Sequence, residues 1–403
     1  MVSIVGLGYV GLPLLIAAFK AGWVVNGVDS DDAKVERLTQ SLSHIEDVSN
    51  VELRDAVNSG KVSFTSNAEE ISKSDIVIFC LPTPTRDDEP DLSILLGAIE
   101  EYAPYFRNDA LIVSESSSFP GTLREKIMPI CEAVRGNKRF HYGHSPERVD
   151  PGNKTWTNRN TPRIISTIDP ESMNRMREFY GSICDHLVEV DSPEIAEAAK
   201  MFENSFRQVN IALVNEFTRY CNNVGLSASK VLNAASTKPF GFMKFNYGIG
   251  VGGHCIPVDP HYLVNHAERN GSKLEIIELS NKVNQEQPKY VLTQIKQLLG
   301  AKVRESRVLV VGLSYKANTS DLRESPSLEL LELLDEEGIQ VSWYDPMCNH
   351  DIKQPLGKPE GKYDLAVVTV LHNEYDYSEI LNACTQILDC TQKIPSAMNV
   401  LHL

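Results

Sequence analysis

The chain has 403 residues, which is long enough for two or three domains that each have their own core. Its formal net charge of -15 argues against a nucleic-acid partner, because a phosphate backbone requires a basic face and no cluster of lysines and arginines stands out. The eight cysteines include no C-x-x-C pair, which favours reduced thiols in a cytoplasm over a disulfide framework. Residues 2–19 are uncharged and long enough to span a membrane, but their glycines have the spacing of a nucleotide-binding turn, so no membrane partner is expected.

The N-terminal stretch is predicted to bind a dinucleotide. The apolar strand at residues 3–5 runs into a glycine-rich turn, and a helical pattern follows. In this fingerprint Gly6 makes the tight turn, Gly8 admits the pyrophosphate and Gly11 lets helix and strand pack closely. The predicted cofactor contacts of the turn are Gly6, Gly8, Tyr9, Val10 and Gly11.

The residues after the second strand indicate which dinucleotide is bound. This strand, residues 24–28, ends at Asp29, whose carboxylate can accept hydrogen bonds from the ribose hydroxyls. Residues 30–32 (Ser-Asp-Asp) follow instead of an arginine, so a 2′-phosphate would be repelled. The sequence therefore predicts NAD rather than NADP, and Lys34 is expected at the same site.

Further strands are expected at residues 75–80, 110–114 and 139–143. Ligands bind at the carboxyl ends of the strands in such sheets. Three predicted cofactor contacts lie in the loops there, with the serines at the nicotinamide end: Thr83, Ser117 and Ser118. The loop after the strand at residues 139–143 carries Glu147. Taken alone, this residue could equally be a solvated acid.

A long helix is predicted from Pro193 to about Val224, where apolar residues recur every three or four positions. A helix of about 30 residues is about 45 Å long, so it can join two domains and supply a dimer face. Lys200 and Asn204 are one turn apart and therefore face the same way. The apolar residues around Lys200 indicate that it points into a site rather than into solvent.

The most unusual stretch is a thiol in a glycine-rich turn. Gly252 and Gly253 let the backbone approach another group closely, and they are followed by Cys255 with Asp259 four residues later. A buried structural cysteine is the simpler interpretation of one thiol among eight. In a chain that also carries a dinucleotide fingerprint, however, a thiol beside a nicotinamide predicts oxidation of an aldehyde through a thioester.

Beyond Pro257 the chain is expected to continue helically towards residues 279–284, and residues 302–306 are expected to be a linker. Four strands then predict a second, smaller α/β sheet without the glycine fingerprint: residues 307–313, 340–344, 365–370 and 387–390. The polar loop at residues 314–326 lies at a strand's carboxyl end and could clamp a second nucleotide. The predicted fold class is α/β, with two Rossmann-like doubly wound domains joined by a helical central domain with a long connecting helix.

These blocks together resemble the UDP-glucose/GDP-mannose dehydrogenase family, whose members oxidise C6 of a nucleotide sugar to a carboxylate with two NAD. The resemblance covers nearly the whole chain and rests on five motifs: residues 6–11, Pro146-Glu147, Lys200 with Asn204, residues 252–255 with Asp259, and residues 316–326. It implies an NAD-binding domain at 1–190, a central domain for dimerisation and catalysis at 191–300, and a UDP-sugar-binding domain at 301–403. It also implies a UDP-sugar substrate, a cytoplasmic homodimer and no metal.

Within the family, the chain departs from the UDP-glucose branch. That branch has serine at the position of His254, Phe-Gln-Lys in place of residues 256–258, phenylalanine at the position of Arg148 and lysine at the position of Asn246. The motifs instead resemble enzymes that act on UDP-N-acetylhexosamines, above all UDP-N-acetylglucosamine. Enzymes for UDP-N-acetylmannosamine share much of the pattern, so the epimer stays open and UDP-glucose is a further alternative.

The resemblance implies a role for each motif residue. Cys255 would form the thiohemiacetal and the thioester, Lys200 and Asn204 would stabilise the oxyanion, and Glu147 would activate the hydrolytic water. Lys200 or a water held by Asp259 would be the base of the first step. The substrate-binding residues would be Glu147, Arg148, Lys200, Asn204, Gly252, His254, Lys316 and Arg323.

Other classes explain less of the sequence. A two-electron 3-hydroxyacid dehydrogenase has no use for Cys255, and a zinc alcohol dehydrogenase needs ligands that the adjacent His254 and Cys255 cannot easily supply to one metal. A catalytically silent NAD-binding scaffold leaves the motif residues unexplained. For Arg323, a surface ion pair with Asp321 or Glu324 is the simpler alternative to substrate binding.

Overall fold

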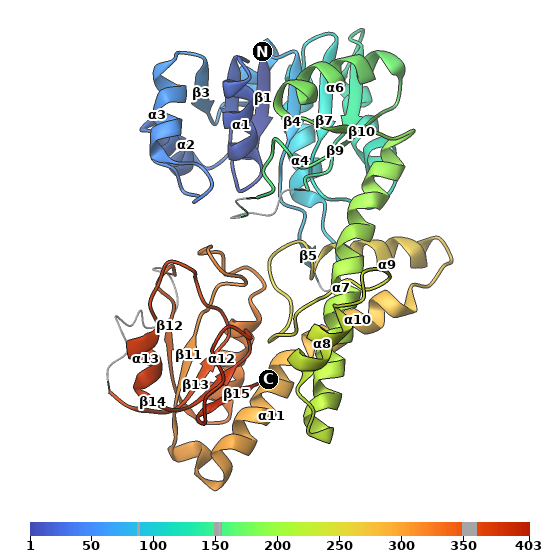
Figure 1. Ribbon diagram of the computed structural model, residues 1–403. Coiled ribbons are helices and arrows are strands. Elements are labelled where there is room, and N and C mark those ends of the chain that lie inside the picture. Colours follow the sequence, from blue (N-terminus) through green and yellow to red (C-terminus); the bar gives the residue numbers. More distant parts are fainter. Residues whose placement is uncertain (87–88, 149–152, 154, 349–360) are drawn as a thin grey trace. The chain divides into compact units, whose positions relative to one another are not determined.

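The computed structural model describes residues 1–86, 89–148, 153, 155–348 and 361–403 (Figure 1). The chain forms two compact units, Met1–Glu203 with His261–Ser272, and Asn204–Pro260 with Lys273–Leu403. Residues 149–152, which continue the predicted Pro146-Glu147 motif, lie outside the described residues. None of the described helices combines the length and the apolarity that are needed to cross a membrane.

The first unit is built on an eight-stranded sheet with the strand order β10-β9-β8-β7-β4-β1-β2-β3. Its strands are β1 (Val2–Val5), β2 (Val25–Val28), β3 (Val62–Thr65), β4 (Ile76–Phe79), β7 (Ala110–Ser114), β8 (Phe140–His144), β9 (Arg163–Thr167) and β10 (Leu187–Glu189). All residues of β1, β2 and β4 are buried, as expected for central strands that are covered on both faces. Of the three, only β4 (Ile-Val-Ile-Phe) is apolar throughout, whereas β1 buries Ser3 and β2 buries Asn26.

Helices and short elements connect the strands of the first sheet, and α1 packs against β1 and β2. They are α1 (Gly11–Lys20), α2 (Asp32–Thr39), α3 (Asn50–Asn58), the 3₁₀ segments Ala68–Lys73 and Ala103–Tyr105, the hairpin β5 (Thr85–Arg86) and β6 (Glu89–Pro90), α4 (Ser93–Tyr102), the π-helical turn Leu123–Ile127, α5 (Met128–Val134) and α6 (Pro170–Ile183). The sequence did not predict β3, β9 and β10, which are short or contain polar residues.

Two strands of this sheet, β9 and β10, run against the direction of the other six, and this changes what lies at the ligand edge. β8 and β9 pair antiparallel, with Gly143 opposite Thr167 and His144 opposite Ser166. The first residue of β9, Arg163, therefore lies beyond the carboxyl end of β8, on the same edge as the loops that follow β7 and β8. An arginine at the start of a strand thus joins the loops in which ligand-binding residues were predicted.

The second unit contains a parallel five-stranded sheet with the order β12-β11-β13-β14-β15. Its strands are β11 (Arg307–Val311), β12 (Gln340–Tyr344), β13 (Tyr363–Val368), β14 (Cys384–Asp389) and β15 (Val400–His402). The helices that contribute to this unit include α8 (Ala228–Ala235), α10 (Glu275–Gln285), α11 (Gln287–Leu299), α12 (Pro326–Glu336) and α13 (Ser378–Asn382). The α/β fold class is confirmed, although the short last strand was not predicted.

Two helices contain residues of both units. The predicted long helix is confirmed as α7 (Pro193–Val224), with both ends where the apolar periodicity placed them. The predicted helix after Pro257 is two helices, α9 (Asp259–Arg269) and α10, because the chain turns between them at Gly271, whose φ is +72°. A 3₁₀ helix, Gly300–Glu305, covers most of the linker expected at residues 302–306.

Candidate active site

The glycines of the N-terminal turn have the environments that the fingerprint predicts. A Cβ atom on Gly6 would lie 2.6 Å from the carbonyl oxygen of Cys80, and one on Gly11 would lie 1.9 Å from that of Gly6. By contrast, no atom of the described residues lies within 4 Å of a Cβ atom built on Gly8. α1 begins directly after Val10, which has no polar side-chain atom to cap the helix. This cradle fits a pyrophosphate, because open space at Gly8 adjoins the amide groups of a helix N terminus.

Asp29 ties this turn to the end of β2. Its carboxylate is 8% exposed and accepts hydrogen bonds from the backbone amide of Leu7 at 2.8 Å and from that of Asp31 at 3.1 Å. Lys34 pairs with the same carboxylate at 2.9 Å, so it lies at the predicted site. The carboxylate thus holds the backbone of the turn and presents a negative charge at the end of the second strand.

The preference for NAD should depend on the charge of Asp29. We expect that Asp29→Asn combined with Ser30→Arg will reduce the preference for NAD, measured as kcat/KM with NAD divided by kcat/KM with NADP. The asparagine keeps an oxygen for the Leu7 amide, while the arginine supplies a partner for a 2′-phosphate. Ser30→Arg alone is the control, since it adds the cation and retains Asp29. A wild-type preference for NADP would contradict the prediction that Asp29, at the end of the second strand, selects NAD.

The loops after β4 and β7 meet where the nicotinamide end was predicted. Ser116 Oγ accepts a hydrogen bond at 3.0 Å from the backbone amide of Leu81, two residues before the half-buried Thr83. Ser117 is half-buried, whereas Ser118 is 1% exposed and its Oγ has no hydrogen-bond partner among the residues that the structure describes. A buried hydroxyl in this position fits a polar group of a bound cofactor.

A buried acid that the sequence analysis missed holds the next part of this loop. Glu197 of α7 is 1% exposed and accepts hydrogen bonds from the backbone amides of Gly121 at 2.6 Å and Leu123 at 2.9 Å. Burial raises the pKa of Glu197 to about 8, although these hydrogen bonds act in the opposite direction. Its position three residues before Lys200, in an apolar run, was the signal that could have identified it.

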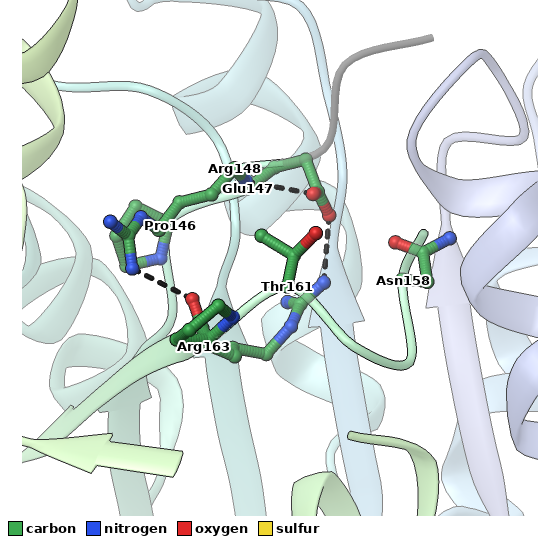
Figure 2. A pocket seen from close by; sticks show the side chains of 7 residues that line it. Pro146, Glu147, Arg148, Asn158, Thr161 and Arg163 are labelled. Carbon is green, nitrogen blue, oxygen red and sulfur yellow. Dashed lines mark hydrogen bonds and ion pairs between the residues drawn. The ribbon is translucent and has the colours of Figure 1, made fainter. Parts of the chain in front are cut away.

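Glu147 and Lys200, which were predicted to act together, are in contact. The Lys200 ammonium donates a hydrogen bond at 2.5 Å to the backbone carbonyl of Glu147, and Lys200 is 8% exposed. The Glu147 carboxylate pairs with Arg163 at 2.8 Å, and both residues line a small pocket together with Pro146, Arg148, Asn158, Thr161 and Pro162 (Figure 2). The lysine therefore points inward, as its apolar neighbours indicated.

Arg148 is directed towards protein groups in this structure. Its guanidinium pairs with Glu203 at 2.7 Å and donates to the carbonyl of Pro162 at 2.7 Å, as the dashed line in Figure 2 shows for the second bond. These contacts position the loop that carries Glu147. The proposed contact of Arg148 with substrate stays a prediction.

In the second unit, Cys255 has the surroundings of a reactive thiol. The other seven cysteines are buried, whereas Cys255 is half-buried. Its Sγ lies 3.0 Å from Nδ1 of His254, and its carbonyl accepts a hydrogen bond at 2.8 Å from the amide of Asp259, the first residue of α9. The thiol thus lies one turn before a helix N terminus and beside an imidazole, two features that reactive cysteines often share.

The structure also brings together two other predicted catalytic residues of this unit. Asp259 is 1% exposed and Asn204 is 5% exposed. The Asn204 amide group donates a hydrogen bond at 2.5 Å to the Asp259 carboxylate. This hydrogen bond holds the Asp259 carboxylate in place. Asp259 lies four residues after Cys255 in the sequence.

The turn that carries Cys255 packs against the predicted clamp loop. Gly253, with φ +79°, donates its backbone N–H to the carbonyl of Arg323 at 2.9 Å. A Cβ atom on Gly252 would lie 2.7 Å from the carbonyl oxygen of Glu324, and one on Gly253 would lie 2.8 Å from the Tyr315 ring. Loop 314–326 and the cysteine turn therefore form one structure, although more than sixty residues separate them in the sequence.

The two cations of the clamp loop lie close to its own side chains. Arg323 pairs with Asp321 at 2.6 Å, which is the ion pair considered as the simpler alternative, and its side chain is 44% exposed. The Lys316 ammonium lies 5.7 Å from the ring centroid of Tyr315. Their roles in substrate binding remain predictions.

A buried Asp–His pair, also missed by the sequence analysis, supports the same loop. Asp345 at the end of β12 accepts hydrogen bonds from the amides of Leu313 at 2.7 Å and Ser314 at 3.1 Å, much as Asp29 holds the turn of the first sheet. His372 lies 3.0 Å from Asp345 through Nε2 and accepts from the amide of Asn318 at 2.8 Å through Nδ1. Burial raises the pKa of Asp345, but the hydrogen bonds from His372 and the amides outweigh it and leave the pKa lowered.

Comparisons with known proteins agree with this geometry. The NAD binding domain model of the UDP-glucose/GDP-mannose dehydrogenase family matches residues 1–184, its central domain model matches 194–286 and its UDP binding domain model matches 309–394. A UDP-N-acetyl-D-glucosamine 6-dehydrogenase of Pseudomonas aeruginosa is 35% identical over 389 residues, covering 93% of this chain and 91% of the relative. The chain belongs to the UDP-glucose/GDP-mannose dehydrogenase family.

Other family members are similarly close. A UDP-N-acetyl-D-mannosamine dehydrogenase of Pyrococcus horikoshii is 32% identical, with 93% of this chain and 90% of the relative covered. The solved structure of the UDP-D-ManNAc dehydrogenase from Pyrococcus horikoshii has a TM-score of 0.89 at 29% identity, with 100% of this chain and 98% of that chain covered. The chain is therefore an NAD-dependent nucleotide-sugar dehydrogenase, and the prediction of NAD is confirmed.

Proposed function

We propose that this dehydrogenase oxidises C6 of a UDP-N-acetylhexosamine, most specifically UDP-N-acetylglucosamine, to the uronic acid through a thioester on Cys255. The observation that carries the proposal is the half-buried thiol, 3.0 Å from the His254 imidazole and one turn before α9. Relatives named for the glucosamine and the mannosamine substrates match at 35% and 32% identity. UDP-N-acetylmannosamine is therefore the alternative substrate.

Four electrons must leave C6, and a covalent adduct divides the oxidation into two steps. NAD, when bound, takes one hydride from C6 in each step. In the first, Lys200 or a water held by Asp259 takes the hydroxyl proton, and the product is an aldehyde that stays bound. The Cys255 thiolate then adds to the aldehyde carbon, and Lys200 and Asn204 donate to the oxyanion. Such donors typically contribute about 3 kcal/mol each to the transition state.

Hydrolysis completes the reaction. The second oxidation converts the thiohemiacetal to a thioester, and a water activated by Glu147 attacks its carbonyl carbon. The C–S bond breaks, the Cys255 thiolate is released and the product is a carboxylate. The contact between Lys200 and the backbone of Glu147 supports this assignment, because it fixes the acid beside a buried cation.

The C-terminal part is proposed to bind the UDP group. A UDP-sugar carries two phosphate charges, whereas the chain has a net charge of -15, so individual cations must neutralise them. Lys316 and Arg323 lie in the loop that packs on the Cys255 turn, which supports their role. We retain the division into an NAD-binding domain (1–190), a central domain (191–300) and a UDP-sugar domain (301–403).

A homodimer is proposed from the exposed apolar side of α7. Four large apolar residues on this helix are 43–60% exposed in the second unit: Phe206, Leu213, Tyr220 and Val224. Their spacing of seven, seven and four residues forms a stripe that a second copy could cover. Light scattering should give twice the mass of one chain, and a monomer would contradict the proposal.

The eight free thiols support a reducing compartment such as the cytoplasm.

The proposed function is tested with a panel of UDP-sugars and a count of NADH per sugar consumed. We expect two NADH and one uronate for each UDP-N-acetylglucosamine, with lower kcat/KM for UDP-N-acetylmannosamine and UDP-glucose. A ratio of one NADH per sugar would indicate a two-electron dehydrogenase. Binding of NAD without turnover of any sugar would indicate a catalytically silent scaffold.

A further inference from the structure

A buried charge cluster lies under Glu147 in the first unit. Arg163, at the start of β9, is 4% exposed and pairs with two acids, Glu115 at 2.8 Å through one terminal nitrogen and Glu147 at 2.8 Å through the other. Figure 2 shows the contact between Arg163 and Glu147 as a dashed line. Glu115 follows β7 and is 2% exposed. One arginine therefore pairs with both carboxylates, one through each of its terminal nitrogens.

The contacts of Glu115 are unequal on its two oxygens. Oε1 accepts hydrogen bonds from Arg163 and from the Tyr180 hydroxyl, at 2.8 and 2.6 Å. Oε2 is buried and has no hydrogen-bond partner within the described part of the chain. A buried carboxylate oxygen without a donor disfavours the ionised form. Burial raises the pKa of Glu115 to about 7, with Arg163 acting in the opposite direction and Glu147 adding to the rise.

Two thiols and a phenol lie close to the cluster. Burial raises the pKa of the Cys80 and Cys184 thiols, and burial together with Glu115 raises that of Tyr180, so these groups stay neutral. Lys200 donates to the Glu147 backbone rather than to either carboxylate of the cluster. The Arg148 guanidinium is paired with Glu203. Compared with these two thiols and the phenol, Glu115 is the group whose raised pKa lies near neutral pH.

We propose that Arg163 and Glu115 are positioning residues for Glu147: Arg163 fixes the Glu147 carboxylate, and the charge of Glu115 sets how strong a base Glu147 is. This inference rests on the proposed role of Glu147 in thioester hydrolysis. When Glu115 is protonated, Arg163 stabilises the Glu147 carboxylate and makes it a weak base. When Glu115 ionises, it competes for Arg163, and Glu147 becomes a stronger base.

The sign of the pH dependence follows from these contacts. The rate of thioester hydrolysis should rise as the pH passes through about 7, where Glu115 loses its proton. Glu115→Gln resembles the protonated acid at every pH, so this rise should disappear. Tyr180→Phe removes a hydrogen bond that favours ionised Glu115, so the rise should move to higher pH. Two variants of one cluster thus have different expected profiles.

The test follows single turnovers of UDP-N-acetylglucosamine with excess full-length enzyme between pH 6 and 9. Acid-quenched samples report uronate, and intact-protein mass spectrometry reports the adduct on Cys255. Above pH 8, Glu115→Gln should hydrolyse the thioester roughly three- to tenfold more slowly than the wild type, because a weaker base assists the attack less. The adduct should then persist longer, whereas at pH 6 the two enzymes should agree.

The controls separate this inference from the proposed function. Glu189→Gln removes an acid that pairs with Arg177 on the surface of the same unit, and its profile should match that of the wild type. Arg163→Met is a poorer test because it leaves the buried Glu115 carboxylate without its cation and so risks unfolding the unit. If the wild type forms the adduct and two NADH but Glu115→Gln shows an unchanged pH profile, the inference is wrong and the function stands. If the wild type forms neither, the proposed function itself fails.

Discussion

The Cys255→Ala variant should form no uronate from any UDP-sugar while it still binds NAD. Removal of the thiol leaves no group to form the thiohemiacetal, so the four-electron oxidation cannot pass its midpoint. The first oxidation does not need the thiol, and at most one NADH per sugar is expected. Uronate measured by chromatography and NADH measured by absorbance distinguish the two steps. Uronate formation by this variant at the wild-type rate would rule out the thioester.

Two further variants sharpen this result. Cys255→Ser should slow the reaction and accumulate an ester, because the alkoxide is harder to form than the thiolate and is a poorer leaving group. Cys221→Ala is the matched control, since Cys221 is a buried thiol in the same unit. Its loss should leave the NADH ratio unchanged. Loss of uronate formation in the control would indicate that the effect at Cys255 is structural.

The features that the sequence predicted correctly are local ones. The glycine spacing of the first turn and the apolar periodicity of α7 each depend on neighbouring residues, and the structure confirms both. The sequence also located the loop at residues 314–326, because a polar stretch after an apolar strand is itself a local pattern, while its role as a clamp stays a prediction. The sequence could not predict the hydrogen bond from the Gly253 amide to the Arg323 carbonyl, because this contact depends on the packing of the whole unit.

The residues that the sequence analysis missed depend on long-range packing. Arg163 contacts Glu115 across 48 positions of the sequence, and it reaches the ligand edge because β9 runs antiparallel to β8. No local pattern gives the direction of that strand. Glu197 and Asp345 likewise hold backbone amides far away in the chain. Acids of this kind appear in a sequence as ordinary charged residues, and their burial identifies them only once the fold is known.

The Gly253→Ala variant should lose most of its activity because this glycine is needed for two reasons. Its φ of +79° costs an alanine about 1–2 kcal/mol. Its Cβ atom would also lie 2.8 Å from the Tyr315 ring, so the ring or the cysteine turn must move. Cys255 is two residues away, and a shift of about 1 Å in a reacting group can lower kcat about 100-fold. We therefore expect kcat for uronate formation to fall by about that factor.

Gly271→Ala separates the two causes. Gly271 has a similar φ of +72°, but no atom of the described residues lies within 4 Å of its Cβ position. This control should show the conformational cost in its thermal unfolding and retain wild-type kcat. Gly253→Ala combined with Tyr315→Leu should recover part of the activity, because the smaller side chain makes room for the methyl group. Equal kinetics for Gly253→Ala and Gly271→Ala would mean that contact with loop 314–326 does not position the thiol.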